Sequence, residues 1–304
     1  METKLNVNHP LFNALSEKFP LWWKNLKNDR ELCIDIRKDN SINIYYNGAS
    51  FLKLEYVSDV FRAKLHPKFI PLDTGDGYIS FDFIDDNIIL PIKKSIEINN
   101  FHESAIKAIK KRIKLINTNE SEKGIQGKYI TVNFASKKEN GFFIDSEFSS
   151  RRDNLRIDMV WIDLQDKKFA FVELKTIGDT RLYLDKKQKN ETIDDQLRKY
   201  SDFASNEKAD LKKYFNCVLQ IKRKLGILPT YVEEISLENF ELIEKPILLI
   251  GDCTTPWITE NAKRINDSIR EFAFGSVYHG IGTNTFQIPY KTNRKRNMYR
   301  LNSD

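Results

Sequence analysis

The sequence predicts an α/β protein, with a mixed β-sheet core flanked by helices and a β-rich N-terminal accessory domain. Three observations lead to this prediction. Short apolar segments alternate with turn residues near the N-terminus, two apolar segments at 155–162 and 169–175 each carry an acid, and helical and strand patterns alternate after residue 192. The chain of 304 residues is long enough for two domains, and we place their boundary between residues 98 and 99.

The N-terminal domain, 1–98, begins with a helical segment at 10–27 that contains Trp22 and Trp23. Segments rich in β-branched and aromatic residues follow, and the turns between them predict a β-meander of unknown role. The expected strands are 32–37, 42–46, 50–56, 78–84 and 87–90. We expect the tryptophans and tyrosines in the core of this domain, and a base-stacking surface is the alternative.

A helix is predicted at 103–116, where it would link the two domains. An apolar stripe on this helix lies opposite a basic face. The basic face comprises Lys107, Lys110, Lys111, Arg112 and Lys114. A solvated surface is the ordinary interpretation of such a face, and contact with nucleic-acid phosphates near a site is the alternative.

The two acid-bearing segments predict a β-hairpin. Asp158 lies in the first strand, and the second strand contains Glu173 and Lys175. We expect a two-residue turn centred on 166–167. This register pairs Asp158 with Lys175, and it pairs Val160 with Glu173. Since opposed residues share a face, Asp158, Glu173 and Lys175 would project to one side of the sheet.

Two carboxylates that meet on one face repel each other unless a cation lies between them. Carboxylate oxygens and water suit Mg²⁺, which can polarise a phosphoryl oxygen and activate a water molecule. A lysine beside the metal can orient that water or stabilise charge in the transition state. Asp158, Glu173 and Lys175 therefore predict metal-dependent phosphodiester hydrolysis. The short Asp/Glu-x-Lys pattern also recurs outside apolar strands, and a structural ion pair on a solvated strand is the alternative.

A further helix is predicted at 192–204, where apolar residues recur at helical spacing. Thr192 followed by Asp195 is typical of a capping box at its start. Gln196 and Tyr200 are four residues apart, so they lie on one face of this helix. A helix flank with a half-buried tyrosine is the ordinary alternative.

These motifs follow one another in a fixed order: Asp158, Glu173-x-Lys175 and Gln196-x-x-x-Tyr200. The order resembles that of the PD-(D/E)xK nuclease superfamily, in particular its RecB-like branch. The resemblance covers about residues 100–290, and it implies a restriction-endonuclease-like fold for the second domain, 99–304. It also implies that Gln196 and Tyr200 line the site and help to orient the substrate.

The resemblance implies a metal site as well. Asp158, Glu173 and the backbone carbonyl of Leu174 would bind Mg²⁺, for which Mn²⁺ would substitute. Lys175 would act on the attacking water molecule. These roles follow from the positions of the residues in the family motif.

The chain departs from the family pattern at two points. Ile157, rather than proline, precedes Asp158. A glutamate on the first core helix is usual in the family, and Glu122 and Glu147 are the candidates for this catalytic role. We favour Glu147, because its strand at 142–148 is expected beside the Asp158 strand. A surface acid is the alternative for either glutamate.

The remaining segments are consistent with a small mixed sheet flanked by helices. Helices are expected at 208–225 and 260–274, and strands at 246–251 and 276–288. A basic tail at 291–300 follows the last predicted strand.

Composition restricts the partners of the chain. A net charge of +6 permits nucleic-acid binding without requiring it. Three widely spaced cysteines fit neither a metal site nor a disulfide framework, which indicates a reducing cytoplasm. No apolar run has the length of a membrane span, so we expect no membrane partner.

The resemblance implies a Mg²⁺-dependent endonuclease that cuts nucleic acid, DNA in preference to RNA, in bacterial phage defence or restriction. Cutting both strands of a duplex would favour a homodimer, and an activating partner or ligand at the N-terminal domain is a further expectation. Two alternatives stay open. One is a non-catalytic nucleic-acid-binding or regulatory protein on the same fold, and the other is an unrelated α/β protein in which the acids form an ion pair.

Overall fold

The computed structural model describes most of the chain, with gaps. The described residues are 4–69, 79–84, 87–89, 103–117, 121–135, 141–150, 152–183, 191–232, 235–280, 286 and 298–300. The chain divides into two compact units. We call residues 2–135 with 214–235 the meander unit, and residues 136–213 with 236–304 the mixed-sheet unit. The predicted domain boundary between residues 98 and 99 lies outside the described residues and stays a prediction.

The meander unit contains a six-stranded antiparallel sheet in which neighbours in sequence are neighbours in space. Its strands are β1 (Leu32–Ile36), β2 (Ile42–Tyr46), β3 (Ala49–Val57), β4 (Val60–Leu65), β5 (Ile79–Ile84) and β6 (Asn87–Ile89). The predicted β-meander is therefore confirmed.

Strand β4 was not predicted from the sequence. The turn that precedes it consists of Ser58 and Asp59, which both adopt left-handed backbone angles, with φ of 50° and 63°. Two left-handed residues are the geometry of a tight hairpin turn, which usually contains Asn-Gly or Asp-Gly. Because neither Asn nor Gly marks this turn, the sequence gives no hairpin signal here.

Among the described residues, five helices contribute to the meander unit. They are α1 (Pro10–Glu17), α2 (Leu21–Asn28), α3 (Glu103–Ile116), α4 (Glu122–Ala135) and α6 (Lys208–Lys224), within which the division between the units falls. The helical character predicted at 10–27 is confirmed, but the segment is interrupted between Glu17 and Leu21. It consists of α1 and α2, since Phe19 has a φ of 44° and proline at position 20 disfavours a helical residue before it. Trp22 and Trp23 are buried, which confirms their predicted place in the core.

Helix α3 has the predicted bounds, and its isoleucines at 106, 109 and 113 are buried as expected. Its basic face is not fully solvated, however. Lys110 is only 8% exposed and donates to Asp29 at 2.5 Å and Glu31 at 2.8 Å. This lysine therefore anchors α3 within the meander unit. The helix was expected to link two domains, but all of its residues belong to this one unit.

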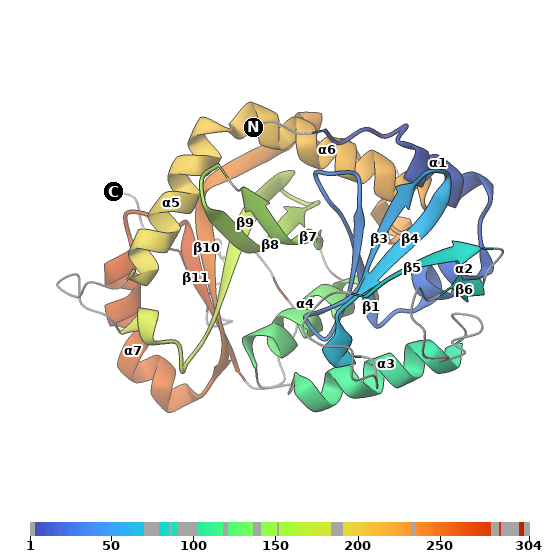
Figure 1. Ribbon diagram of the computed structural model, residues 1–304. Helices are drawn as coiled ribbons and strands as arrows, with labels where there is room; N and C mark the ends of the chain where they lie inside the picture. The colour runs from blue at the N-terminus through green and yellow to red at the C-terminus, as the bar shows by residue number, and fades with distance from the viewer. Residues whose placement is uncertain are drawn as a thin grey trace. The chain divides into compact units, whose positions relative to one another are not determined.

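The mixed-sheet unit contains a second six-stranded sheet, in the order β12-β11-β10-β9-β8-β7. Its strands are β7 (Gly141–Ser150), β8 (Leu155–Asp163), β9 (Lys168–Thr176), β10 (Glu241–Cys253), β11 (Gly275–Gly280) and β12 (Met298–Arg300). The first three are antiparallel, whereas β9, β10 and β11 run parallel to one another. Helices α5 (Ile193–Asn206) and α7 (Thr255–Ile269) lie beside β10 and β11 (Figure 1). Buried side chains of these four elements form one apolar core. The chain is thus an α/β protein with a mixed sheet and helices.

The hairpin between β8 and β9 is present, but the predicted register is wrong by two residues. Val160 pairs with Phe171 rather than with Glu173. The turn contains the four residues 164–167, because the Asp163 side chain accepts from the amide of Asp166 at 2.9 Å and Lys167 has a φ of 51°. A shift of two residues preserves the side-chain alternation of a strand, so the predicted face is unchanged.

Segments nearer the C-terminus differ from their predicted bounds. Helix α7 begins at Thr255, five residues earlier than predicted, because the Thr254 side chain caps it by accepting from the amide of Trp257. The predicted final strand corresponds to β11 as far as Gly280, and most of the basic tail lies outside the described residues. Within the described part of the chain, no helix has the length and apolar character required to cross a membrane.

Candidate active site

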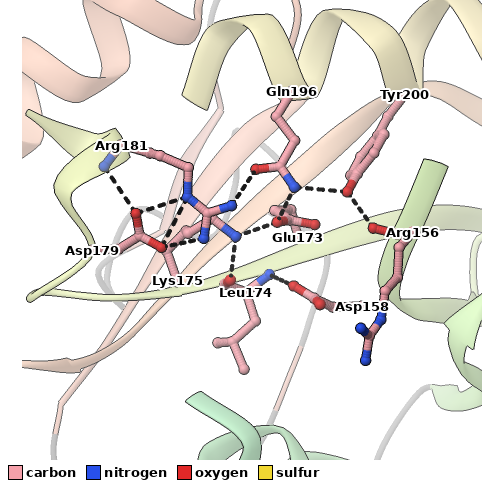
Figure 2. Close-up of polar contacts among 9 residues, drawn as sticks. All are labelled: Arg156, Asp158, Glu173, Leu174, Lys175, Asp179, Arg181, Gln196 and Tyr200. Atoms are coloured by element: carbon pink, nitrogen blue, oxygen red, sulfur yellow. Dashed lines mark hydrogen bonds and ion pairs between the residues drawn. The ribbon is translucent and has the colours of Figure 1, made fainter. Parts of the chain in front are cut away.

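Strand β9 holds the central residues of the candidate site. Glu173 and Lys175 alternate with Leu174 along this strand, and each of the two charged residues is only 1% exposed. Charged side chains are almost never buried to this extent unless they are paired. The Lys175 ammonium donates to Oε1 of Glu173 and, at 2.9 Å, to the carbonyl oxygen of Leu174 (Figure 2).

Asp158 lies on β8, next to the last residue pair that joins this strand to β9. Its Oδ2 accepts from the backbone amide of Leu174 at 2.9 Å. The carboxylate therefore takes the place of a backbone acceptor at this end of the hairpin. As a result, Asp158, Glu173 and the backbone of Leu174 lie together (Figure 2). The strand pattern predicts that the side chains of Asp158 and Glu173 share one side of the sheet.

The pKa of Glu173 is raised to about 8, first because burial disfavours the charged carboxylate and second because Asp158 lies nearby. The Lys175 ammonium opposes this effect only in part. Oxygen Oε1 of Glu173 has hydrogen-bond donors, whereas Oε2 is buried and has no hydrogen-bond partner among the described residues. A buried carboxylate oxygen without a donor is unusual in proteins, and a cation would satisfy it.

The donor set fits a hard divalent cation. Two carboxylates and a backbone carbonyl, with water for the remaining positions, are the oxygen ligands that Mg²⁺ uses. The described residues contain no cluster of three or more His, Cys, Asp or Glu side chains arranged for a metal ion. Any cation at this site would therefore depend on Asp158, Glu173 and the Leu174 carbonyl.

Helix α5 supplies the second layer of the site. The predicted capping box at its start is confirmed, since the Thr192 and Asp195 side chains and amides bond reciprocally. Gln196 donates through Nε2 to Oε1 of Glu173 at 2.7 Å and to the hydroxyl oxygen of Tyr200 at 2.8 Å. Gln196 and Tyr200 therefore share one face of the helix, and this face contacts β9 (Figure 2).

Tyr200 connects the cluster to strand β8. Its hydroxyl donates to the carbonyl oxygen of Arg156 (Figure 2). Burial first, and the Glu173 carboxylate second, raise the pKa of Tyr200 far above its ordinary value, so the phenol stays protonated at any physiological pH. Tyr200 acts here as a fixed donor and acceptor rather than as a base.

Two residues of the cluster were not predicted. Arg181 donates through Nη1 to Oε1 of Gln196 at 3.4 Å. Asp179 accepts three hydrogen bonds from the same guanidinium, two from Nε at 2.9 and 3.2 Å and one from Nη2 at 2.5 Å. The two residues belong to a short 3₁₀ turn, η2 (Thr180–Leu182), and Asp179 is its N-cap. An acid two residues before an arginine, in a polar loop that directly follows the Glu-x-Lys strand, is the signal that could have identified them.

The two candidate glutamates belong to different units of the chain. Glu147 has a left-handed backbone, with a φ of 57°, and its side chain forms an ion pair with the Arg156 guanidinium. Because the Arg156 carbonyl accepts from Tyr200, Glu147 is connected to the cluster through one intervening residue. Glu122 is the first residue of helix α4, in the meander unit. A direct part in the chemistry stays a prediction for Glu147.

Comparison of the chain with protein-family models, with curated proteins and with solved structures finds no match. The chemistry of the site therefore has to be inferred from its own residues.

Proposed function

We propose that the protein is a metal-dependent nuclease that hydrolyses phosphodiester bonds of nucleic acid, DNA in preference to RNA. The observation that supports this proposal most directly is the arrangement around Glu173. Its Oε1 accepts from Lys175 and Gln196, while its Oε2 is buried without a hydrogen-bond partner in the described part of the chain. The carboxylate is thus held in place with one oxygen available for a cation.

Asp158, Glu173 and the Leu174 carbonyl would hold Mg²⁺, and Mn²⁺ would substitute for it. When bound, the cation would polarise a phosphoryl oxygen and lower the pKa of a coordinated water molecule. The three ligands come from two adjacent strands, β8 and β9. Rigid elements of this kind hold ligands more accurately than loops do.

The other residues of the cluster would position the Glu173 carboxylate and balance its negative charge. The Lys175 ammonium has three donors on a flexible chain, so it can reach the attacking water or a phosphate oxygen while it stays beside Glu173. Gln196 and Tyr200 fix the orientation of the Glu173 carboxylate through their hydrogen bonds. Burial of the cluster strengthens each of these electrostatic interactions.

One contact favours a second candidate function, that of a non-catalytic nucleic-acid-binding or regulatory protein. The Lys175 ammonium bonds both the Glu173 carboxylate and the Leu174 carbonyl, which are two of the expected metal ligands. In this arrangement the lysine supplies the positive charge that a metal would otherwise supply. On this alternative the protein would bind nucleic acid equally well with and without divalent cations.

Cleavage assays distinguish the two functions. Purified protein would be incubated with plasmid, linear duplex, single-stranded DNA and RNA, in Mg²⁺, in Mn²⁺ and in EDTA. We expect cleavage only with a divalent cation, and a loss of about 10²- to 10⁴-fold in Lys175→Met, which is the range for a general acid–base group. Lys168→Met is the matched control, because Lys168 lies on the same strand at a partly exposed position. Cleavage that survives in Glu173→Gln would reject the nuclease proposal.

A bacterial defence or restriction role is the setting in which such a nuclease would serve. It remains part of the proposal, together with a homodimer for double-strand cutting and an activator that engages the N-terminal region. If no substrate is cut under any metal condition, titration of candidate activators into the same assay would test that part.

A further inference from the structure

An exposed aromatic side chain lies close to the candidate site in the chain. Tyr183 is 43% exposed, and it directly follows the η2 turn that carries Arg181. Two residues span at most about 7 Å between their Cα atoms, so Tyr183 cannot lie far from Arg181. Arg181 in turn donates to Gln196 of the candidate site.

The Tyr183 ring is held in place from several sides. The indole Nε1 of Trp257 donates to the Tyr183 hydroxyl oxygen at 2.8 Å, and this hydroxyl donates to the Ile177 carbonyl at 2.5 Å. The Arg264 guanidinium lies 5.3 Å from the centre of the Tyr183 ring and donates to the Leu182 carbonyl at 3.0 Å. An exposed tyrosine that is fixed by these contacts loses little further conformational freedom when a ligand stacks on it.

The two side chains that contact Tyr183 belong to helix α7 of the mixed-sheet unit. Trp257 and Arg264 lie on α7, seven residues apart and hence on one face of the helix. Trp257 packs against the apolar core beneath α7, where its ring lies 6.4 Å from that of the buried Tyr278. The surface therefore combines a fixed aromatic ring with a neighbouring cation.

We propose that Tyr183, with Trp257 and Arg264, forms a stacking platform for a nucleobase of single-stranded nucleic acid that enters the candidate site. A fixed aromatic ring beside an arginine is the combination that binds single strands, because the ring stacks on any base and the cation attracts the phosphates. Bases inside a duplex already stack on one another and present no free face. The platform rests on the proposed function, and it specifies the substrate as a single strand or a frayed end.

The test compares two oligonucleotides that differ only in their bases. Fluorescence anisotropy in EDTA would measure binding of the full-length protein to a labelled single-stranded DNA and to an abasic strand of the same length. Stacking of one base predicts that Tyr183→Ala weakens binding of the normal strand by about 5- to 150-fold. The same substitution should leave binding of the abasic strand unchanged, since that strand has no base to stack.

Two further variants test the role of the ring. Tyr183→Phe keeps the ring and its contact with Arg264 but loses the two hydrogen bonds of the hydroxyl, so its affinity for the normal strand should lie between those of the wild type and Tyr183→Ala. Tyr231→Ala removes another exposed tyrosine, which is 37% exposed and lies in the meander unit, and it should have no effect. Equal losses on both strands, a Tyr183→Phe protein as weak as Tyr183→Ala, or no binding of single strands by the wild-type protein would overturn the platform.

The binding and cleavage experiments together distinguish failure of the platform from failure of the nuclease proposal. Base-dependent binding by a protein that shows no metal-dependent cleavage, with or without the candidate activators, would support the platform and reject the nuclease. Cleavage that is lost in Glu173→Gln, together with binding that ignores the bases, would support the nuclease and reject the platform.

Discussion

Gln196 donates to Oε1 of Glu173 at 2.7 Å and so connects helix α5 to strand β9. The orientation of its amide is fixed, because its own Oε1 accepts from Arg181 while its Nε2 donates to Glu173 and Tyr200. The Gln196 amide thus donates to Glu173 and Tyr200 and accepts from Arg181.

Gln196→Glu tests this arrangement with almost no change in shape. The new carboxylate would face the buried Glu173 carboxylate with an acceptor in place of a donor. We expect the free energy of unfolding to fall by about 1–3 kcal/mol, and metal affinity or activity to fall about 10- to 100-fold. Gln165→Glu, in the exposed β8–β9 turn, is the matched control and should change neither quantity. A Gln196→Glu protein with wild-type activity would show that this hydrogen bond does not position Glu173.

Arg181→Gln tests the outer contact of the same chain of hydrogen bonds. Without the guanidinium, Gln196 can rotate its amide and present its oxygen to Glu173. We expect the Mg²⁺ concentration for half-maximal cleavage to rise about 10- to 100-fold, with the rate at saturating Mg²⁺ nearly preserved. Arg198→Gln is the control, because Arg198 lies on the same helix as Gln196 but pairs at the surface with Asp195. An equal loss of rate at saturating Mg²⁺ would instead indicate contact between Arg181 and the substrate.

The helix of the site could be predicted from sequence because its signals are local. The capping box at Thr192 and the four-residue spacing of Gln196 and Tyr200 depend only on helical geometry, and the structure contains both. The two apolar segments that carry Asp158 and Glu173 likewise predicted the hairpin of β8 and β9.

The hairpin register and the roles of Arg181 and Lys110 were not predicted, because they depend on contacts that a local sequence pattern does not indicate. The hairpin register is set by the bond between the Asp163 side chain and the Asp166 amide, which lengthens the turn. Arg181 joins the site only because the chain after β9 folds back towards α5. Lys110 looked like part of a solvated basic face because its acidic partners, Asp29 and Glu31, are distant in sequence.

The raised pKa of Glu173 has a consequence for stability. Its value of about 8 exceeds the ordinary 4.5, so between these pH values the folded protein binds a proton that the unfolded chain has released. The free energy of unfolding in EDTA should therefore decrease as the pH rises from about 5 to 8, by at most about 1.4 kcal/mol per pH unit from this group.

Urea unfolding of the wild-type and Glu173→Gln proteins in EDTA, at several pH values, measures this contribution as the difference between the two. Glu244→Gln is a control in which the pH dependence should have the opposite sign. Hydrogen bonds from Lys208 and Ser205 lower the pKa of Glu244 below its ordinary value, so the contribution of Glu244 to the free energy of unfolding should increase with pH. A wild-type-minus-Glu173→Gln difference that does not vary with pH would show that Glu173 titrates normally.

The same carboxyl predicts how metal binding depends on pH. A cation must displace the proton of Glu173, so the apparent affinity for Mg²⁺ should increase up to tenfold per pH unit below about 8 and then level off. The shift of the thermal unfolding midpoint with Mg²⁺ concentration, measured at several pH values, gives this affinity. An affinity for Mg²⁺ that is independent of pH would show that the cation displaces no proton from Glu173.

The meander unit contains a buried ion pair outside the candidate site, and this pair should control stability rather than activity. Lys222 donates to Asp35 at 3.2 Å, and both side chains are 1% exposed. Removal of one partner from a buried pair leaves an uncompensated charge, which typically costs about 3–5 kcal/mol. Since Arg37 also contacts Asp35, we expect Lys222→Met to fall at the lower end of this range.

The double variant Asp35→Asn/Lys222→Met provides the decisive comparison. It removes both charges, so its loss of unfolding free energy should be smaller than the sum of the two single losses, with a coupling of about 0.5–3 kcal/mol. Lys208→Met is the control, since Lys208 forms an exposed pair with Glu244 and should cost no more than about 1 kcal/mol. Chemical denaturation measures all four variants. Strictly additive losses would show that Asp35 and Lys222 stabilise the unit independently, although their charges lie within hydrogen-bond distance.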